Sequence, residues 1–280
     1  MKTIGVLGCG LMGAGIAQVS AAAGFRTIVL EVNDAMLAKG LARVDKVLSG
    51  AVEKGKLSAD DKARTLANLT GTTHFADLKD CDLVIEAIVE QVEAKRSAYQ
   101  QVEAVVGSHC LIATNTSSLC VTELAAATSR PDRFGGLHFF NPVPMMKLVE
   151  VIRALTTTPE THEALMQFAR ALGKDAVSVP DRGGFIVNRL LIPYLLDAIR
   201  SHEAGLGTVE DIDTAMKLGC GHPMGPFTLL DFIGLDTTYF IANILFDEFK
   251  ETRFAPPALL KRMVLAGHLG KKSGRGFYTY

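Results

Sequence analysis

Six residues near the amino terminus, Gly8-Cys9-Gly10-Leu11-Met12-Gly13, have the spacing G-x-G-x-x-G that binds the pyrophosphate of a dinucleotide. The first glycine permits a tight turn, the second lets backbone N–H groups approach the phosphates, and the third lets the next helix pack on the strand. An apolar run over 2–7 precedes the motif and a helical pattern over 11–23 follows it. Because a helix N-terminus favours an anion, this context predicts a dinucleotide site.

Glu31 ends the next predicted strand, 26–31, and lies 18 residues beyond Gly13. A carboxylate at this position accepts hydrogen bonds from a ribose 2′-hydroxyl and repels a 2′-phosphate. Glu31 therefore favours NAD over NADP. FAD is a lesser alternative, because the same glycine turn serves both cofactors. Dinucleotide binding indicates hydride transfer but specifies no substrate.

Three further polar groups follow predicted strands at their carboxyl ends, where α/β sheets bind ligands. They are Asn115-Thr116-Ser117-Ser118 after the strand 110–114, His138-Phe139-Phe140-Asn141-Pro142 at the end of the strand that begins at 134, and Glu86 with Glu90 after the strand 82–86. A histidine accepts a proton from an alcohol near neutral pH, and Glu150, on the following alternating stretch, is able to hold its imidazole and favour the protonated form. The competing interpretations are a structural His138, a solvated Glu150 and ordinary turn chemistry for the Asn-Thr-Ser-Ser run.

A basic strip lies on the predicted helix 34–54. Lys39, Arg43 and Lys46 are spaced four and three residues apart and so share one face of that helix, and Lys54 follows at its end. The strip is suited to the phosphates of a substrate, although such strips are more often solvated helix faces.

The elements that must position these residues alternate between strand and helix over the first part of the chain. Strands are expected at 2–7, 26–31, 82–86, 110–114, 134–139 and 147–152, and helices at 11–23, 34–54, 58–69 and 91–106. This alternation predicts a doubly wound parallel sheet of Rossmann type. Only helices are expected afterwards, at 184–204, 208–218, 226–233, 236–250 and 256–266. We therefore predict a nucleotide-binding α/β domain over 1–183 and an all-helical domain over 184–280.

The composition is that of a globular protein, with 48% hydrophobic and 21% charged residues. The 29 basic and 30 acidic side chains give a formal charge of −1, so neither nucleic acid nor an anionic membrane is an expected partner. Residues 3–25 carry no charge, but six glycines interrupt them, and we therefore reject a membrane span or a signal peptide. The five cysteines have no CxxC spacing and indicate reduced thiols in a cytoplasmic protein without a metal site.

With these motifs in place, the chain resembles the short-chain L-3-hydroxyacyl-CoA dehydrogenases, especially the bacterial 3-hydroxybutyryl-CoA dehydrogenases, over essentially all of its 280 residues. The matching motifs are Gly8–Gly13, Glu86-Ala-Ile-Val-Glu90, Asn115–Ser118, His138–Pro144, Asp181–Arg189 and Lys271–Tyr278. The resemblance implies a Rossmann-type domain and a helical domain that binds substrate and forms a homodimer. It also implies reversible NAD-linked oxidation of an (S)-3-hydroxyacyl-CoA, expected to be 3-hydroxybutyryl-CoA, to the 3-ketoacyl-CoA.

The resemblance further implies roles for individual residues. Under it, His138 is the catalytic base and Glu150 is its partner. Ser117 and Asn188 would hydrogen-bond the substrate oxygen, and Lys54 would lie near CoA. The implied NAD contacts are the glycine loop 8–13 and Glu31, Glu90, Lys95, Asn115, Ser117, Asn141 and Lys272. Glu31 departs mildly from the family, in which aspartate is expected, and the departure concerns coenzyme affinity alone.

Two other functions stay open at this point. One is a dehydrogenase of small hydroxy acids that resembles the L-gulonate enzyme, for which the basic strip over 39–56 would serve no CoA group. The other is a crystallin-like structural protein that binds NAD without needing catalysis. Packing alone would not require the polar set Ser117, His138, Glu150 and Asn188 in such a protein.

Overall fold

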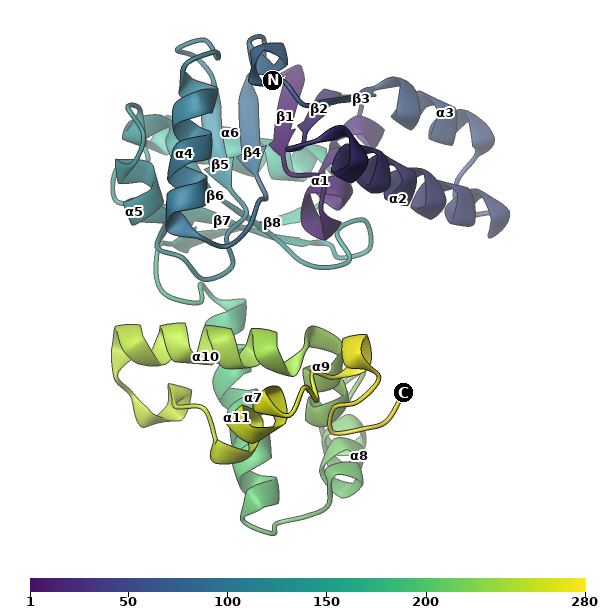
Figure 1. Cartoon of the computed structure of the whole chain (residues 1–280), viewed down its shortest axis with the longest axis vertical. Coiled ribbons are helices and arrows are strands. Elements are labelled where there is room, and N and C mark those ends of the chain that lie inside the picture. Colours follow the sequence, from purple (N-terminus) through teal and green to yellow (C-terminus); the bar gives the residue numbers. More distant parts are fainter. The chain divides into compact units, whose positions relative to one another are not determined.

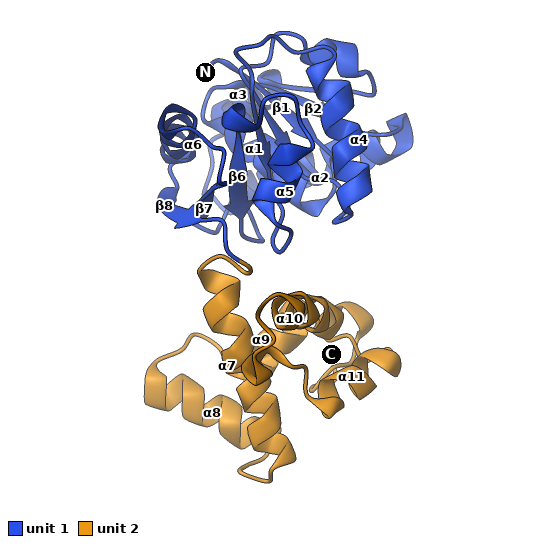
Figure 2. Ribbon diagram, turned by 90° about the vertical axis from the view of Figure 1, so that its left-hand side faces the viewer, with its two compact units in different colours: residues 1–182 blue, residues 183–280 orange.

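The computed structural model describes all 280 residues, which form two compact units, Met1–Arg182 and Gly183–Tyr280 (Figure 2). Each unit has its own hydrophobic core. The first unit is built on an eight-stranded sheet covered by helices, and the second is helical. The predicted fold class, a Rossmann-type sheet followed by an all-helical domain, is therefore confirmed.

The sheet of the first unit has the strand order β3-β2-β1-β4-β5-β6-β7-β8 (Figure 1). The strands are β1 (Thr3–Leu7), β2 (Arg26–Leu30), β3 (Leu69–Thr72), β4 (Leu83–Glu86), β5 (Leu111–Thr114), β6 (Phe134–Phe139), β7 (Leu148–Arg153) and β8 (Asp175–Pro180). The order from β3 to β6 is that of a dinucleotide-binding sheet, in which the direction of winding reverses between β1 and β4.

All strand pairs are parallel except β6 with β7, which is antiparallel. The expectation of a wholly parallel sheet is therefore wrong at this pair. The connection between the two strands, residues 140–147, is too short for the crossover that parallel neighbours require, which takes roughly a dozen residues or more.

Helices cover both faces of this sheet. They are α1 (Leu11–Ala22), α2 (Asp34–Glu53), α3 (Ala59–Ala67), α4 (Val92–Glu103), α5 (Val121–Ala126) and α6 (Pro159–Ala171), with 3₁₀ turns at Phe75–Leu78 and Pro131–Arg133. Side chains of α1, α2 and α6 share one core with strand residues such as Ile4, Leu83 and Leu137. On the opposite face, Tyr99 of α4 packs edge-on against Phe134 of β6, with ring centroids 5.1 Å apart. Burial on both faces explains why most of these strands are apolar runs without alternation.

Side-chain caps fix the starts of α2 and α3. Asn33 Oδ1 accepts the Met36 N–H at 2.9 Å at the start of α2. Ser58 Oγ accepts the Asp61 N–H at 3.0 Å at the start of α3, so the predicted helix start at Ser58 is confirmed. Gly40 lets α2 lie against the loop, because a Cβ there would be 2.2 Å from the Cys9 Sγ.

The second unit consists of α7 (Val187–Glu203), α8 (Val209–Cys220), α9 (Pro226–Ile233), α10 (Leu235–Phe249) and α11 (Ala258–Leu265), with 3₁₀ turns at Thr252–Phe254 and Lys271–Ser273. Two buried aspartates hold its carboxyl-terminal segment. Asp213 accepts the Tyr278 hydroxyl at 3.0 Å, and Asp231 accepts the Tyr278 N–H at 2.8 Å. No single helix of the chain is long and apolar enough to cross a membrane, although α9 and α10, bent by 94°, pass that test as a pair.

Candidate active site

The glycine loop, residues 8–13, joins β1 to α1 and has open space beside Gly10. Gly8 adopts a φ of +89°, and its N–H donates to the Leu30 carbonyl oxygen at 2.8 Å. A Cβ at Gly13 would lie 1.9 Å from the Gly8 carbonyl oxygen, whereas a Cβ at Gly10 would meet nothing within 4 Å. The first turn of α1 has neither a side-chain cap nor an acidic residue. Open space at Gly10 and an uncapped helix N-terminus fit the pyrophosphate of NAD.

Glu31 directly follows β2 and is only 7% exposed. Its Oε2 accepts the Cys9 N–H at 2.8 Å, and its Oε1 accepts the Val32 N–H at 2.7 Å. The carboxylate therefore holds the glycine loop against the end of β2. The ribose contact of Glu31 stays a prediction, and its contact with the loop was missed, because a backbone N–H as partner leaves no signal in the sequence.

His138 and Glu150 form a buried pair, 5% and 1% exposed. The antiparallel register of β6 and β7 places them directly opposite each other, and His138 Nδ1 lies 2.7 Å from Glu150 Oε2. Because β7 runs against β6, its amino end and the carboxyl end of β6 lie at the same edge of the sheet. Glu150 fixes the ring through Nδ1, so proton exchange with a substrate falls to Nε2. The arrangement is that of a general base whose cationic form a carboxylate stabilises.

Asn115 links the ends of three strands at that edge. Its Oδ1 accepts the Phe139 N–H at 3.0 Å, and its own N–H donates to the Glu86 carbonyl oxygen at 2.8 Å. The side chain of Asn115 therefore positions the strand that carries His138. The predicted contact of Asn115 with NAD stays a prediction.

Glu90 receives hydrogen bonds from the loop after β5 and from α4. Its Oε1 accepts the Ser117 N–H at 3.0 Å and the Thr116 hydroxyl, while its Oε2 lies 3.1 Å from Lys95 Nζ. Lys95 is 1% exposed, and its ammonium also pairs with Glu86 at 2.6 Å. The structure thus brings Ser117, Glu90 and Lys95 together, with Lys95 between two carboxylates. Direct contacts of these residues with NAD stay predictions.

Asn141 lies on the exposed loop between β6 and β7. Lys174, which was not predicted from the sequence, binds the backbone of this loop. Its buried Nζ donates to the carbonyl oxygens of Val143 at 2.6 Å and Met146 at 2.8 Å. Burial without a carboxylate partner lowers the pKa of Lys174. Lys174 lies in the connection between α6 and β8, where a lysine is expected to be exposed. The sequence therefore gave no indication that its side chain is buried.

The remaining predicted site residues occupy other elements. Lys54 is exposed and ends α2. In the second unit, Asn188 lies in the first turn of α7, and Lys272 Nζ pairs with Asp236 at 2.6 Å. Their roles toward substrate and NAD stay predictions.

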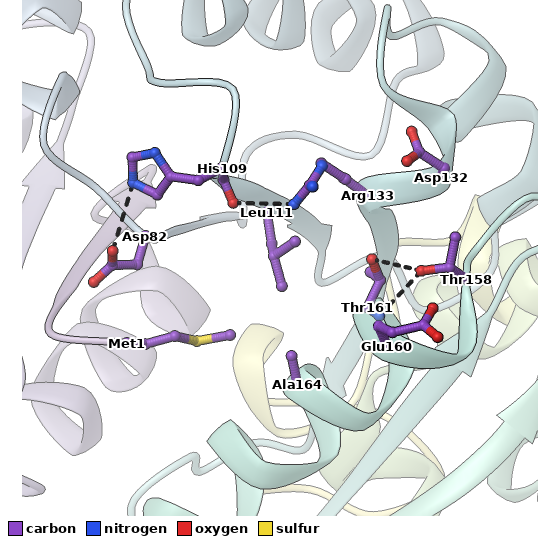
Figure 3. A pocket seen from close by; sticks show the side chains of 10 residues that line it. All are labelled: Met1, Asp82, His109, Leu111, Asp132, Arg133, Thr158, Glu160, Thr161 and Ala164. Atoms are coloured by element: carbon purple, nitrogen blue, oxygen red, sulfur yellow. Dashed lines mark hydrogen bonds and ion pairs between the residues drawn. The ribbon is translucent and has the colours of Figure 1, made fainter.

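A cavity of about 490 Å³ lies at the other edge of the sheet (Figure 3). Asp82 lines it just before β4, His109 just before β5, Leu111 at the start of β5 and Arg133 just before β6. His109 Nε2 lies 3.6 Å from Asp82 Oδ1. These residues mark the amino ends of the strands, whereas doubly wound sheets bind ligands at the carboxyl ends. The cavity is therefore separate from the glycine loop and from the His138–Glu150 pair.

Protein-family models match both units. Residues 3–182 match the NAD binding domain of 3-hydroxyacyl-CoA dehydrogenase, and residues 184–280 match its C-terminal domain. The chain belongs to the 3-hydroxyacyl-CoA dehydrogenase family. It is an NAD-dependent oxidoreductase, so the family, the cofactor and the reaction class that the sequence motifs imply are confirmed.

Relatives of this dehydrogenase align over the whole of this chain. It is 50% identical to the 3-hydroxybutyryl-CoA dehydrogenase of Mycobacterium tuberculosis, with 100% of the chain and 99% of the relative covered. It is 48% identical to the mitochondrial hydroxyacyl-coenzyme A dehydrogenase of Rattus norvegicus, with 100% and 91% covered. The crystal structure of (S)-3-hydroxybutyryl-CoA dehydrogenase from Ralstonia eutropha superimposes with a TM-score of 0.97 at 45% identity, covering 100% and 99% of the two chains.

Proposed function

We propose that this dehydrogenase oxidises (S)-3-hydroxybutyryl-CoA reversibly to acetoacetyl-CoA with NAD. The relatives from Mycobacterium tuberculosis and Ralstonia eutropha carry that substrate in their names and align over the full chain. The observation that supports the chemistry best is the buried His138–Glu150 pair, with 2.7 Å between Nδ1 and Oε2. A histidine held in this way is suited to take a hydroxyl proton near neutral pH.

In the oxidation, His138 Nε2 accepts the proton of the 3-hydroxyl group, and Glu150 stabilises the resulting imidazolium. Ser117 and Asn188 hydrogen-bond the substrate oxygen while it becomes a carbonyl oxygen. A bound NAD would supply the acceptor for the hydride that leaves C3. In the reduction, the imidazolium returns its proton to the oxygen on which negative charge develops.

The same proposal assigns the residues that hold NAD. The N–H groups of the loop 8–13 bind the pyrophosphate, and Glu31 binds the ribose. The other proposed NAD contacts are Glu90, Lys95, Asn115, Ser117, Asn141 and Lys272. The open space at Gly10 and the position of Glu31 after β2 support this assignment.

Steady-state oxidation of NADH with acetoacetyl-CoA and with longer 3-ketoacyl-CoAs tests the substrate. We expect the highest kcat/KM for acetoacetyl-CoA. A higher kcat/KM for a longer chain would overturn the four-carbon substrate while leaving the reaction intact. Absence of turnover with every 3-ketoacyl-CoA would overturn the reaction itself.

The coenzyme preference gives a second measurement. We expect kcat/KM to be at least about tenfold higher with NADH than with NADPH, ~1.4 kcal/mol, because Glu31 meets a 2′-phosphate as a like charge. Glu31→Gln keeps one acceptor oxygen, which is able to serve the Cys9 N–H, and removes the charge, so the ratio of the two kcat/KM values should fall. A ratio that does not change in Glu31→Gln would show that the charge of Glu31 does not select the coenzyme.

Lys54 is proposed to lie near the CoA group. Lys54→Glu is expected to raise KM for acetoacetyl-CoA about threefold to tenfold, because an exposed attraction becomes a repulsion. KM for NADH should stay within about twofold. Lys79→Glu, a charge reversal at another exposed lysine, serves as the matched control. Equal KM values for acetoacetyl-CoA in the two variants would make Lys54 an ordinary solvated residue.

We further propose a homodimer formed through the helical unit. This unit exposes a large apolar side chain on each of its five helices and one in the connection between α7 and α8. They are Leu190, Leu218, Phe232, Phe240 and Leu265 on the helices and Leu206 in the connection. Such side chains favour a covered interface, and sedimentation at micromolar concentration measures the oligomeric state.

We also propose a cytoplasmic location. It is supported by the buried free thiols of Cys81 and Cys110, whose pKa values burial raises to about 12, as in inert reduced cysteines.

A further inference from the structure

Glu86, at the end of β4, is a fully buried carboxylate whose two oxygens are both occupied. Oε1 accepts from Lys95 Nζ at 2.6 Å and from the Ile88 N–H at 2.9 Å. Oε2 accepts from the Tyr99 hydroxyl at 2.7 Å and from the Thr114 hydroxyl at 2.9 Å. The two oxygens therefore face different partners, with the ammonium on one and the two hydroxyls on the other.

From Lys95 the contacts continue to the loop after β5. The same ammonium lies 3.1 Å from Glu90 Oε2, and Glu90 Oε1 accepts the Ser117 N–H at 3.0 Å. Glu90 Oε1 also accepts the hydroxyl of Thr116. A continuous chain of charged contacts thus runs from Glu86 through Lys95 and Glu90 to the backbone of Ser117.

Stability alone gives no reason for charges at this place. Replacing a buried ion pair by packed apolar side chains is often neutral or stabilising, whereas charged contacts impose a fixed geometry on their partners. Here the charged contacts fix the geometry of one loop. Lys95, on α4, pairs with Glu86 and with Glu90, and Glu90 accepts hydrogen bonds from Ser117 and Thr116.

We propose that Glu86 is a positioning residue for the reaction, which through Lys95 and Glu90 sets the loop that presents Ser117 to the substrate oxygen. The inference rests on the proposed role of Ser117. A displacement of about 1 Å at such a contact lowers turnover by up to about 100-fold without weakening binding in proportion. Glu86 contacts neither substrate nor cofactor in this scheme and acts only through Lys95.

Tyr99 provides a matched control, because it donates to the same carboxylate on the oxygen that Lys95 does not use. Tyr99→Phe removes this hydrogen bond and keeps the ring that packs on Phe134. A merely structural Glu86 predicts that Glu86→Gln and Tyr99→Phe have similar effects on kcat. A positioning Glu86 predicts that only Glu86→Gln lowers kcat, about 10-fold to 100-fold, with KM for acetoacetyl-CoA within about threefold.

The decisive experiment measures two things on the full chain, kcat with acetoacetyl-CoA and NADH, and amide hydrogen exchange at residues 116–118. We expect Glu86→Gln to speed exchange at Ser117 and to lower kcat, and we expect Tyr99→Phe to leave both near the values of the unmodified protein. In a Ser117→Ala background, Glu86→Gln should lower kcat less than threefold further, because the hydroxyl that it positions is gone. If Glu86→Gln does not fold, Glu86→Asp, which keeps the charge and withdraws the carboxylate from Lys95 by one methylene, replaces it with the same expectations.

Unchanged exchange at Ser117 in Glu86→Gln would overturn the inference whatever the substrate is. Additive losses of kcat in the Ser117→Ala background would also overturn it. Faster exchange at Ser117 in a protein that does not reduce acetoacetyl-CoA would support the positioning contact and contradict the proposed substrate instead.

Discussion

His138→Gln is expected to lower kcat for acetoacetyl-CoA reduction about 10²-fold to 10⁴-fold, the usual contribution of a general acid–base residue. Glutamine is the informative replacement, because its amide N–H is able to donate to Glu150, which is 1% exposed and would otherwise lose this hydrogen bond. The variant should therefore fold and bind NADH with an affinity within about threefold of the original. Steady-state assays measure kcat, and a fluorescence titration measures the affinity for NADH. Turnover near that of the unmodified protein would remove His138 from the mechanism.

Glu150→Gln should lower kcat as well, because a neutral amide stabilises the imidazolium less than a carboxylate does. Its effect should be strongly non-additive with that of His138→Gln, since Glu150 acts through the ring. In the double variant, kcat is expected to fall little below that of His138→Gln alone. Additive losses would leave His138 as the base and make Glu150 independent of it.

The cofactor site and the catalytic pair differ in how well the sequence could predict them. The glycine motif lies within six consecutive residues, and a requirement such as the 1.9 Å approach of a Cβ at Gly13 to the Gly8 carbonyl oxygen follows from the residue types, so the motif is recognisable in the sequence. The pairing of His138 with Glu150 depends on the direction of β7 and on its register. The direction follows from the short connection 140–147, but the register does not. The sequence therefore suggested Glu150 as the partner of His138 without fixing that the two residues face each other.

Elements at the periphery of the first unit were missed for physical reasons. β3 is a four-residue edge strand with the sequence LTGT, and β8 is mostly exposed, so neither has an apolar run. α6 was missed although Thr158 followed by Pro159 is a sequence pattern typical of a helix start. In the structure Thr158 accepts the Thr161 N–H at 3.2 Å and Pro159 occupies the first turn. The burial of Lys95 had no local signal, since its partner Glu86 lies on another element.

Lys95→Met is expected to lower the free energy of unfolding of the first unit by about 3–5 kcal/mol, because it leaves Glu86 fully buried without its cation. The adjacent Arg96→Met is the matched control on the same helix. Arg96 pairs with Glu93 at 3.3 Å through a side chain that is 41% exposed, so its loss should change stability by less than about 1 kcal/mol. Urea unfolding followed by circular dichroism at constant m compares the two variants.

A second substitution separates the unpaired charge from lost packing. Glu86→Gln added to Lys95→Met removes the uncompensated carboxylate, and the double variant should therefore be more stable than Lys95→Met alone. The hydroxyls of Tyr99 and Thr114 still meet an acceptor in the glutamine amide, so their hydrogen bonds persist. Similar losses in Lys95→Met and Arg96→Met would show that the buried pair contributes no more than an exposed one. Failure of Glu86→Gln to restore stability would assign the loss to the packing of the lysine side chain, not to its charge.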